Sequence, residues 1–263
     1  MNRSIRVNPS FTPILTQHNL DSLEKVMRFA GNVVMREVPG RITVKVELPG
    51  GYVFYLKRHT PPNPQAASAG PREWDNIATL SRLGISCPAP VAAGSGVLDG
   101  APCSFLITAA IPDSIPLDDY LRQFYHGHGD FTDWQTKRLL IPKLADLAGR
   151  LHRHGFHHKD FYLCHVFVNR KTPLAAPLTL IDLQRLDRIR FFRRRWVVKD
   201  LAALNYSATT AFATAADRLR FLMAYLGISR LTPTARRLIR SINRKTARIR
   251  RHDRKLQDLC RTR

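Results

Sequence analysis

The sequence lacks several features that would assign it to a common protein class. Its four cysteines include no C-x-x-C pair, so neither a disulfide framework nor a zinc knuckle is indicated, and a reducing compartment is the simpler expectation. No apolar run approaches the roughly 18 residues needed to span a bilayer, and residues 1–17 have no continuous apolar core typical of a signal peptide. A Walker A sequence is missing, which excludes the P-loop class, and so is a G-x-G-x-x-G loop.

Acidic residues are also scarce, and their scarcity is uneven. The net charge is +22, and residues 181–263 hold 22 Lys and Arg against six Asp, a net charge of +16. This C-terminal segment is expected to face an anion: nucleic acid, an anionic lipid surface, or a phosphorylated or carboxylated glycan. Net charge alone does not distinguish these partners. A basic surface that is merely solvated and binds none of them is the alternative.

The first part of the chain is predicted to be mostly β structure. Residues 42–48 alternate apolar and polar side chains, Pro49-Gly50-Gly51 turns the chain, and residues 52–57 return as a second strand. Residues 60–71 form a loop by composition, residues 72–83 have the apolar spacing of a helix, and residues 103–111 are a candidate buried strand. Strand, strand, helix and strand is the order of elements in the N-lobe of a kinase.

From about Pro116 the pattern becomes helical. Helices are expected over residues 117–125, 134–154, 196–206, 215–226 and 233–259, the last with basic side chains around much of its circumference. The predicted fold is therefore α+β, with a small β-rich N-lobe and a larger helical C-lobe. We expect an N-terminal extension (1–32), an N-lobe (33–111), a C-lobe (112–230) and a basic C-terminal helix (231–263).

Two acidic loops carry the strongest functional signal. His158-Lys159-Asp160 has the form H-x-D, and a polar residue, His165, stands five residues after the Asp. This is the arrangement of a kinase catalytic loop, in which the Asp accepts the proton of the acceptor hydroxyl. Asp182 follows 22 residues later and ends an apolar segment, where a kinase holds its metal. A turn or a helix cap remains the alternative for both aspartates.

Phosphoryl transfer also needs a cation on the nucleotide and a group that fixes it. Lys57 closes the second strand of the hairpin, although a solvated lysine is the commoner explanation for a single strand-end Lys. The chain has only four glutamates, and Glu73, in the helix predicted after Lys57, is the only one that follows it. The helix dipole would equally favour a Glu there. The order of Lys, helix Glu, H-x-D and second Asp strengthens the functional interpretation.

The remaining candidates are weaker. Without a G-x-G-x-x-G loop, the turn at Pro39-Gly40-Arg41 would hold phosphates through fewer backbone amides, with Arg41 as a supplementary cation. His165 can ligate a metal, but Mg²⁺ prefers oxygen, so its role is open. The histidines between His152 and His165 have no carboxylate or Cys at a recognised zinc spacing. His158 is expected to brace the loop.

With these residues in place, the chain resembles the bacterial lipopolysaccharide kinase family, the Kdo and heptose inner-core kinases with a protein-kinase-like fold. Residues 158–165 resemble its catalytic motif, with Lys159 for the usual Arg, and residues 181–185 resemble its metal-binding strand. Residues 196–207, which contain Asp200, and residues 217–225 resemble its C-lobe signatures. The resemblance covers roughly residues 33–226. Thr108-Ala109-Ala110-Ile111 departs from it, because the family's hinge usually carries acidic residues.

The resemblance implies a function and roles for the candidate residues. The reaction would move the γ-phosphoryl group of ATP, with Mg²⁺, to a sugar hydroxyl of the lipopolysaccharide inner core on the cytoplasmic face of the inner membrane. The implied roles are catalytic for Asp160, Lys57 and Glu73, ATP-binding for Lys57, Gly40, Arg41 and Thr108, metal-binding for Asp182 and His165, and loop support for His158 and Asp200. The protein would be peripheral on the anionic inner membrane, with the glycolipid rather than nucleic acid as its partner.

Two other functions remain open at this point. One is a small-molecule or protein kinase of the same fold, which only the acceptor would distinguish. The other is a catalytically silent kinase-like module that binds RNA or an anionic membrane through residues 181–263. The presence of Lys57, Glu73, Asp160 and Asp182 together argues against the silent module. The sequence indicates neither the sugar carbon that is phosphorylated nor an oligomeric state.

Overall fold

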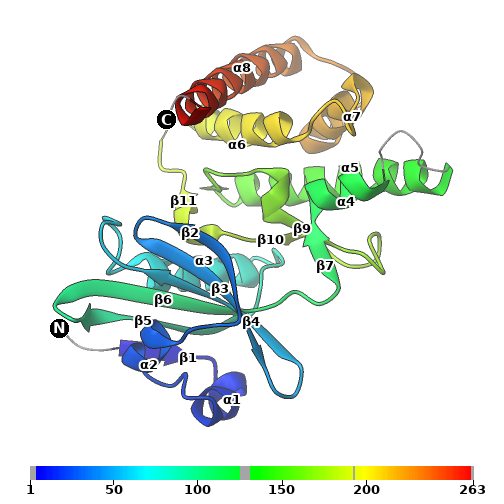
Figure 1. Cartoon of the computed structure of the whole chain (residues 1–263). Coiled ribbons are helices and arrows are strands. Elements are labelled where there is room, and N and C mark those ends of the chain that lie inside the picture. Colours follow the sequence, from blue (N-terminus) through cyan, green and yellow to red (C-terminus); the bar gives the residue numbers. More distant parts are fainter. Residues whose placement is uncertain (1–3, 125–130, 192, 262–263) are drawn as a thin grey trace. The chain divides into compact units, whose positions relative to one another are not determined.

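A computed structural model describes residues 4–124, 131–191 and 193–261 (Figure 1). The chain divides into two compact units, each described by itself below. Unit 1 comprises residues 1–112 and 182–184, and unit 2 comprises residues 113–181 and 185–263. The α+β class predicted from the sequence is confirmed, because unit 1 contains a six-stranded sheet and unit 2 is mainly helical.

Unit 1 is built on an antiparallel sheet with the strand order β1-β5-β6-β4-β3-β2. Its strands are β1 (Ser4–Val7), β2 (Val33–Val38), β3 (Arg41–Leu48), β4 (Tyr52–His59), β5 (Pro90–Leu98) and β6 (Ala101–Ala109). Its helices are α1 (Thr12–Gln17), α2 (Leu23–Arg28) and α3 (Ala69–Arg82). The predicted hairpin, the helix after it and the strand at 103–111 are confirmed within a few residues.

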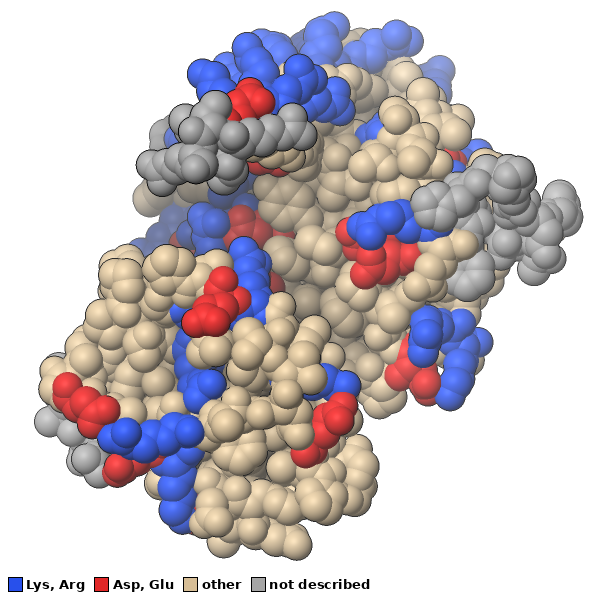
Figure 2. Space-filling view, viewed as in Figure 1, with Lys and Arg blue, Asp and Glu red and all other residues tan. Residues whose placement is uncertain are grey.

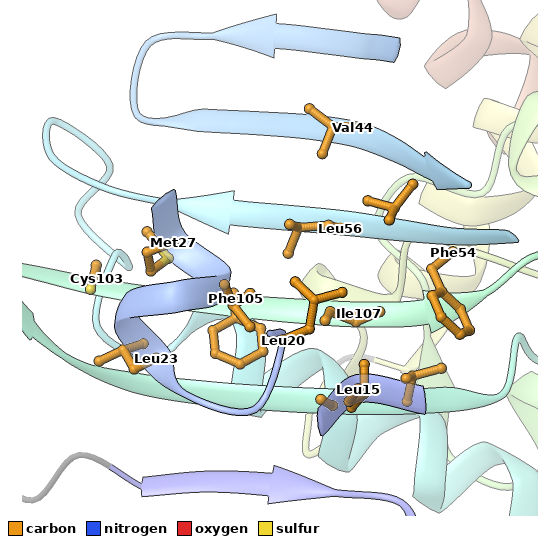
Figure 3. Close-up of a cluster of buried hydrophobic side chains, with 14 residues drawn as sticks. Leu15, Leu20, Leu23, Met27, Val44, Phe54, Leu56, Cys103, Phe105 and Ile107 are labelled. Atoms are coloured by element: carbon orange, nitrogen blue, oxygen red, sulfur yellow. The ribbon is translucent and has the colours of Figure 1, made fainter. Parts of the chain in front are cut away.

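The two faces of this sheet receive different helices. Successive side chains of a strand point to opposite faces, so Leu56 and Arg58 face α1 and α2, while Lys57 and His59 face the other way. Leu56 is fully buried in the cluster of Figure 3, to which α1 contributes Leu15, α2 contributes Leu23 and the connection between them contributes Leu20. Arg58 donates to the carbonyl oxygens of Met27 and Phe29 at the end of α2, at 2.8 and 2.6 Å.

Residues 1–32 therefore differ from the expected extension. β1 pairs with β5, and α1 and α2 supply side chains to the buried core of unit 1 (Figure 3). Helices α1 and α2 have six residues each and are separated by a turn at Asn19, so they give too little periodicity to be detected as core elements. Strand β5 was not predicted either, since Gly94 and Gly96 weaken the strand signal of Pro90–Leu98.

Unit 2 consists mostly of helices. They are α4 (Leu117–Phe124), α5 (Phe131–Arg153), α6 (Arg193–Ser207), α7 (Ala215–Leu226) and α8 (Pro233–Arg261). Short strands accompany them: β7 (Ser114–Pro116), β9 (Val166–Asn169) and β10 (Thr179–Leu180) form one sheet, and β8 (Phe156–His157) and β11 (Asp187–Arg188) form another. The helices predicted here are confirmed within a few residues, except that Tyr125 lies outside the described residues.

The C-terminal helix is not separate from unit 2. Ile242 of α8 is buried with Leu201 and Ala202 of α6 and Leu222 of α7 (Figure 1). The hydroxyl of Thr246 in α8 accepts from the side-chain amide of Asn205 at 3.0 Å and donates to the carbonyl oxygen of Ala202 at 3.3 Å. One face of the basic helix is thus fixed by apolar packing. Among the described residues, no helix is both long and apolar enough to cross a membrane.

Candidate active site

Unit 1 brings three of the predicted charged residues together. The Lys57 ammonium of β4 lies 2.7 Å from Oε1 of Glu73 in α3 and 2.9 Å from Oδ1 of Asp182. Burial alone would lower the pKa of Lys57, but the carboxylates of Glu73 and Asp182 outweigh it, so the pKa is raised and the ammonium stays charged. The expected pairing of the strand lysine with the helix glutamate is present in the structure.

The backbone after Asp182 is held against α3 by the same glutamate. Oε1 of Glu73 also accepts from the backbone N–H of Leu183 at 3.1 Å, and the side-chain amide of Asn76, one turn further along α3, donates to the carbonyl oxygen of Leu183 at 2.7 Å. Asp182 itself has a φ of 57°, an uncommon backbone conformation for a residue with a side chain. This strained position directs its carboxylate toward Lys57.

Unit 2 contains the loop with Asp160. Both carboxylate oxygens of Asp160 lie 2.9 Å from Nη1 of Arg185. The carbonyl oxygen of Asp160 accepts from the backbone N–H of Tyr162 at 2.8 Å and lies 2.7 Å from Nδ1 of His165. The Asp160 side chain is 23% exposed, so it is reachable from solvent while its orientation is fixed.

Asp200 supports this loop from α6. Its carboxylate is fully buried and accepts from the backbone N–H groups of His158 and Lys159 at 2.6 and 2.9 Å. Nε2 of His152 lies 3.3 Å from the same carboxylate. Burial would raise the pKa of Asp200, but these donors hold it below its usual value, so it remains an anion at neutral pH. The loop thus rests on a buried charge.

His158 connects the loop with the segment that precedes Asp182. Its Nε2 lies 2.9 Å from the carbonyl oxygen of Ile181, and the backbone N–H of Ile181 donates to the carbonyl oxygen of His165 at 3.0 Å. Lys159, with a φ of 72°, extends its ammonium to Asp187, at 2.9 Å. His158 therefore contacts the segment before Asp182, and its support of the loop stays a prediction.

The three residues expected to contact ATP besides Lys57 lie in the sheet of unit 1. Gly40 occupies the turn between β2 and β3 with a φ of 73°, and a Cβ there would lie 2.5 Å from the backbone nitrogen of Asn63. This close approach explains the glycine without reference to a nucleotide. Arg41 stands opposite His59, and Thr108 stands opposite Tyr55. Their part in nucleotide binding stays a prediction.

Some residues at these positions were not predicted. Arg185 is one of these: it ends the segment 181–185, and its pairing with Asp160 has no sequence signal beyond its place three residues after Asp182. Asn76 and Leu183 fix the segment after Asp182, and only the spacing of Asn76 from Glu73 along one helix face hints at this. The metal role of His165 also stays a prediction, since no cluster of three or more metal-ligating side chains occurs among the described residues.

A strand lysine paired with a helix glutamate, and an H-x-D loop held by a buried aspartate, define a phosphotransferase with a protein-kinase-like fold. A search of solved structures agrees: a structure described as WaaP in complex with acyl carrier protein matches with a TM-score of 0.71 and 28% identity, over 96% of this chain and 99% of that one. Two further comparisons use the sequence.

A family model described as Lipopolysaccharide kinase (Kdo/WaaP) family matches residues 59–225. The lipopolysaccharide core heptose(I) kinase WaaP of Pseudomonas aeruginosa is 31% identical over 226 residues, or 78% of this chain and 80% of the relative. The protein of the same name from Escherichia coli K12 is 29% identical over 79% of this chain and 82% of the relative. The chain belongs to the lipopolysaccharide kinase (Kdo/WaaP) family. It is an ATP-dependent sugar kinase, as the resemblance implied.

Proposed function

We propose that this protein transfers the γ-phosphoryl group of ATP to a hydroxyl of the first heptose in the lipopolysaccharide inner core. The observation that carries the proposal is the ion pair of Lys57 with Glu73 and Asp182 in a chain whose relatives are named heptose(I) kinases. Heptose is favoured over Kdo as the acceptor because each of these relatives carries the heptose name. The silent-module alternative gives the buried lysine and its two carboxylates no purpose.

The charged residues support distinct roles in this reaction. Lys57 would bind the nucleotide phosphates, and Glu73 would hold its ammonium in place, since a kinase needs a fixed cation there. Asp160 would orient the acceptor hydroxyl and accept its proton, because a partly exposed carboxylate held by Arg185 can meet a substrate from solvent. The turn at Gly40 and Arg41 would cover the phosphates, and Thr108 would lie near the base.

Mg²⁺ is the metal that the family implies. Asp182 fits it in chemistry, because Mg²⁺ binds through one or two carboxylates and takes its other ligands from substrate phosphates and water. His165 fits less well, since its Nδ1 already lies 2.7 Å from the carbonyl oxygen of Asp160 and imidazole is the softer ligand. The ion would neutralise charge on the phosphates, while Asp182 would hold it and Lys57 would compete for the same carboxylate until nucleotide arrives.

We also infer peripheral contact with the anionic cytoplasmic face of the inner membrane. The outward side of α8 carries exposed arginines, among them Arg236, Arg237, Arg240 and Arg251, and Figure 2 shows basic side chains gathered over this helix. Each basic residue near such a surface contributes about 1 kcal/mol. Lipopolysaccharide precursors would be met at this surface, and nucleic acid is not expected as a partner.

An acyl carrier protein is a second candidate partner. The matching solved structure is a WaaP complex with acyl carrier protein. In unit 2 of the present chain, helices α4 to α8 line a cavity of about 350 Å³ whose walls are mostly apolar, with Lys137, Asp217 and Arg218 among the lining residues. An apolar cavity of this size suits an acyl chain. We infer that the chain binds an acyl carrier protein through this cavity.

The phosphotransfer proposal is tested by incubating the purified protein with γ-labelled ATP, Mg²⁺ and lipopolysaccharide from which core phosphate has been removed. Label should appear in the core sugar and should depend on Mg²⁺. The contrary result is label transfer to a protein substrate with none to the glycolipid, which would favour a protein kinase of the same fold.

A further inference from the structure

Unit 2 has a second concave surface, between α6 and α8. It holds about 880 Å³ and is lined by residues of both helices: Arg194, Arg195, Trp196, Val198, Lys199, Ser241, Arg244, Lys245 and Arg248. Six of these nine side chains are cationic and none is acidic. We call this surface the α6–α8 groove. Figure 2 shows the basic character of the α8 side of unit 2.

The cations of the groove are not matched by carboxylates in contact with them among the residues that the structure describes. None of the six forms an ion pair within 4 Å in the described part of the chain, whereas Lys137, Lys159 and Arg185 of the same unit each pair with an aspartate. The packing of Ile242 and Thr246 against α6 fixes both walls, so the cations cannot separate by moving the helices. Like charges held together without counter-charges raise the energy of the folded state unless an anion binds.

Lys199 shows this lack of compensation most directly. It is half-buried in the groove, and burial and the nearby Arg185 and Lys159 lower its pKa, although Asp160 and Asp200 act in the opposite direction. The surroundings thus disfavour the charged form of Lys199, and an anion bound in the groove would favour it. Lys199 precedes Asp200 in α6, and the carboxylate of Asp200 accepts from the backbone N–H of Lys159, the residue before Asp160, at 2.9 Å. The α6 wall of the groove is therefore connected to the Asp160 loop through adjacent residues.

Trp196 adds a flat apolar surface to this basic site. One face of its ring system stacks on His157, with centroids 4.3 Å apart and planes at 28°. The Cζ of Arg195 and the ammonium of Lys199 lie over the ring, 5.5 and 5.9 Å from its centroid, and the side chain of Trp196 is partly exposed. An aromatic ring with adjacent cations can contact the C–H face of a sugar while the cations bind its anionic substituents.

We propose that the α6–α8 groove binds an acidic saccharide, namely the carboxylate- or phosphate-bearing sugars adjacent to the sugar that is phosphorylated. Trp196 would pack against a sugar ring, and Arg244, Lys245 and Arg248 would bind the anionic groups. Lys199 would join this binding region to Asp160. The inference rests on the proposed function, because it assigns the groove to the acceptor of that reaction. It favours a saccharide over RNA because the groove has a single aromatic side chain, and stacked single strands need a series of them.

The test compares two triple variants of the full chain with equal loss of charge. The groove variant is Arg244→Gln, Lys245→Gln and Arg248→Gln. The control is Arg138→Gln, Arg170→Gln and Arg230→Gln, which removes three exposed arginines of unit 2 that do not line the groove. The acceptor is soluble, delipidated core oligosaccharide, used with its carboxylates intact or reduced to alcohols, so that membrane contact plays no part.

The groove variant should raise the KM for the intact oligosaccharide at least ~10-fold, with kcat and the KM for ATP unchanged, because several charge-assisted contacts are lost only from binding. The control should behave as wild type. Reduction of the carboxylates should raise the wild-type KM and leave that of the groove variant nearly unchanged. An unchanged KM for the groove variant, or equal effects in groove and control variants, would overturn the assignment.

Oligosaccharide binding without ATP, measured by calorimetry, separates this inference from the proposed function. Loss of binding in the groove variant alone, with no phosphotransfer by wild type, would retain the groove as a saccharide site and refute the kinase activity. Phosphotransfer by wild type, together with full oligosaccharide binding by the groove variant, would support the proposed function and refute the groove as the saccharide site. Selective loss of acyl carrier protein or RNA binding, with oligosaccharide affinity intact, would assign the groove to that partner and overturn the proposal.

Discussion

The ammonium of Lys57 lies 2.7 Å from Oε1 of Glu73, and the Glu73 side chain is only 3% exposed. Its other oxygen, Oε2, has no hydrogen-bond partner in the part of the chain that the structure describes. A buried carboxylate in this state depends on its cation, because an uncompensated buried charge is costly. The pair therefore links the stability of unit 1 with its proposed role in holding ATP.

Lys57→Met should destabilise the protein strongly. It leaves the carboxylates of Glu73 and Asp182 without their cation, and breaking such a buried pair costs about 3–5 kcal/mol of unfolding free energy. Adding Glu73→Gln to Lys57→Met should recover part of this loss, since the second substitution removes the stranded charge. Urea unfolding followed by circular dichroism measures both effects. Equal stability of the single and double variants would show that the pair contributes little.

Asp182→Asn should weaken ATP binding in the presence of Mg²⁺ and change it little in the presence of a chelator, because the carboxylate is proposed to hold the metal rather than the nucleotide itself. Isothermal titration calorimetry measures the two affinities. Asp75→Asn is the matched control in unit 1, since Asp75 is exposed and pairs with the exposed Arg6. If Mg-ATP affinity is unchanged in Asp182→Asn, the residue is structural.

Asp160→Asn should lower turnover at least ~10²-fold while ATP binding survives, since a residue that accepts a proton and orients the acceptor acts mainly in the transition state. Steady-state kinetics with the core acceptor check this. Asp146→Asn removes an equal charge from an exposed pair with Arg153 and should be silent. An Asp160→Asn enzyme with near-normal turnover contradicts the assignment of the catalytic loop.

Charge reversal on the outward side of α8 should affect only membrane-bound acceptor. Replacing Arg236, Arg237, Arg240 and Arg251 by Glu should raise the apparent KM for glycolipid in anionic vesicles and leave kinetics on soluble core sugar unchanged. The wild-type preference for vesicles should fade between 0.05 and 0.5 M salt, because the Debye length falls from about 14 to about 4 Å. A salt-independent preference would mean that apolar contacts bind the membrane.

Two buried histidines predict loss of stability in mild acid. Burial, assisted by Lys57 and Arg41, lowers the pKa of His59 to about 4, and burial lowers that of His157 to about 4, both from 6.5. Between pH 6.5 and 4 the unfolded chain therefore binds more protons, so stability falls as pH falls, by roughly 1–2 kcal/mol per histidine at pH 5. Thermal unfolding at pH 7 and 5 should show a smaller difference for His59→Gln than for His252→Gln, which replaces an exposed histidine.

Features of the fold and site that depend on local residue pattern, or on the order of motifs along the chain, could be predicted from the sequence. The hairpin around Lys57, the helix of Glu73 and the long helices of unit 2 have clear periodicity and were located within a few residues. The pairing of Asp160 with Arg185 could not be predicted, because nothing in the sequence tells which of several arginines meets a given carboxylate. The burial of Leu15 and Leu23 was missed for a related reason: their short helices are stabilised by covering a sheet that later residues form.

The central claim, phosphorylation of the first heptose by a mechanism that needs Asp160, is tested most directly by mass spectrometry of the product. Wild type and Asp160→Asn are incubated with Mg²⁺, ATP and two dephosphorylated core oligosaccharides, one with the first heptose and one that ends before it. The account predicts one added phosphate, located on the first heptose by fragmentation, only with wild type and only on the longer oligosaccharide. Phosphate on the shorter oligosaccharide, or equal product from Asp160→Asn, would contradict it.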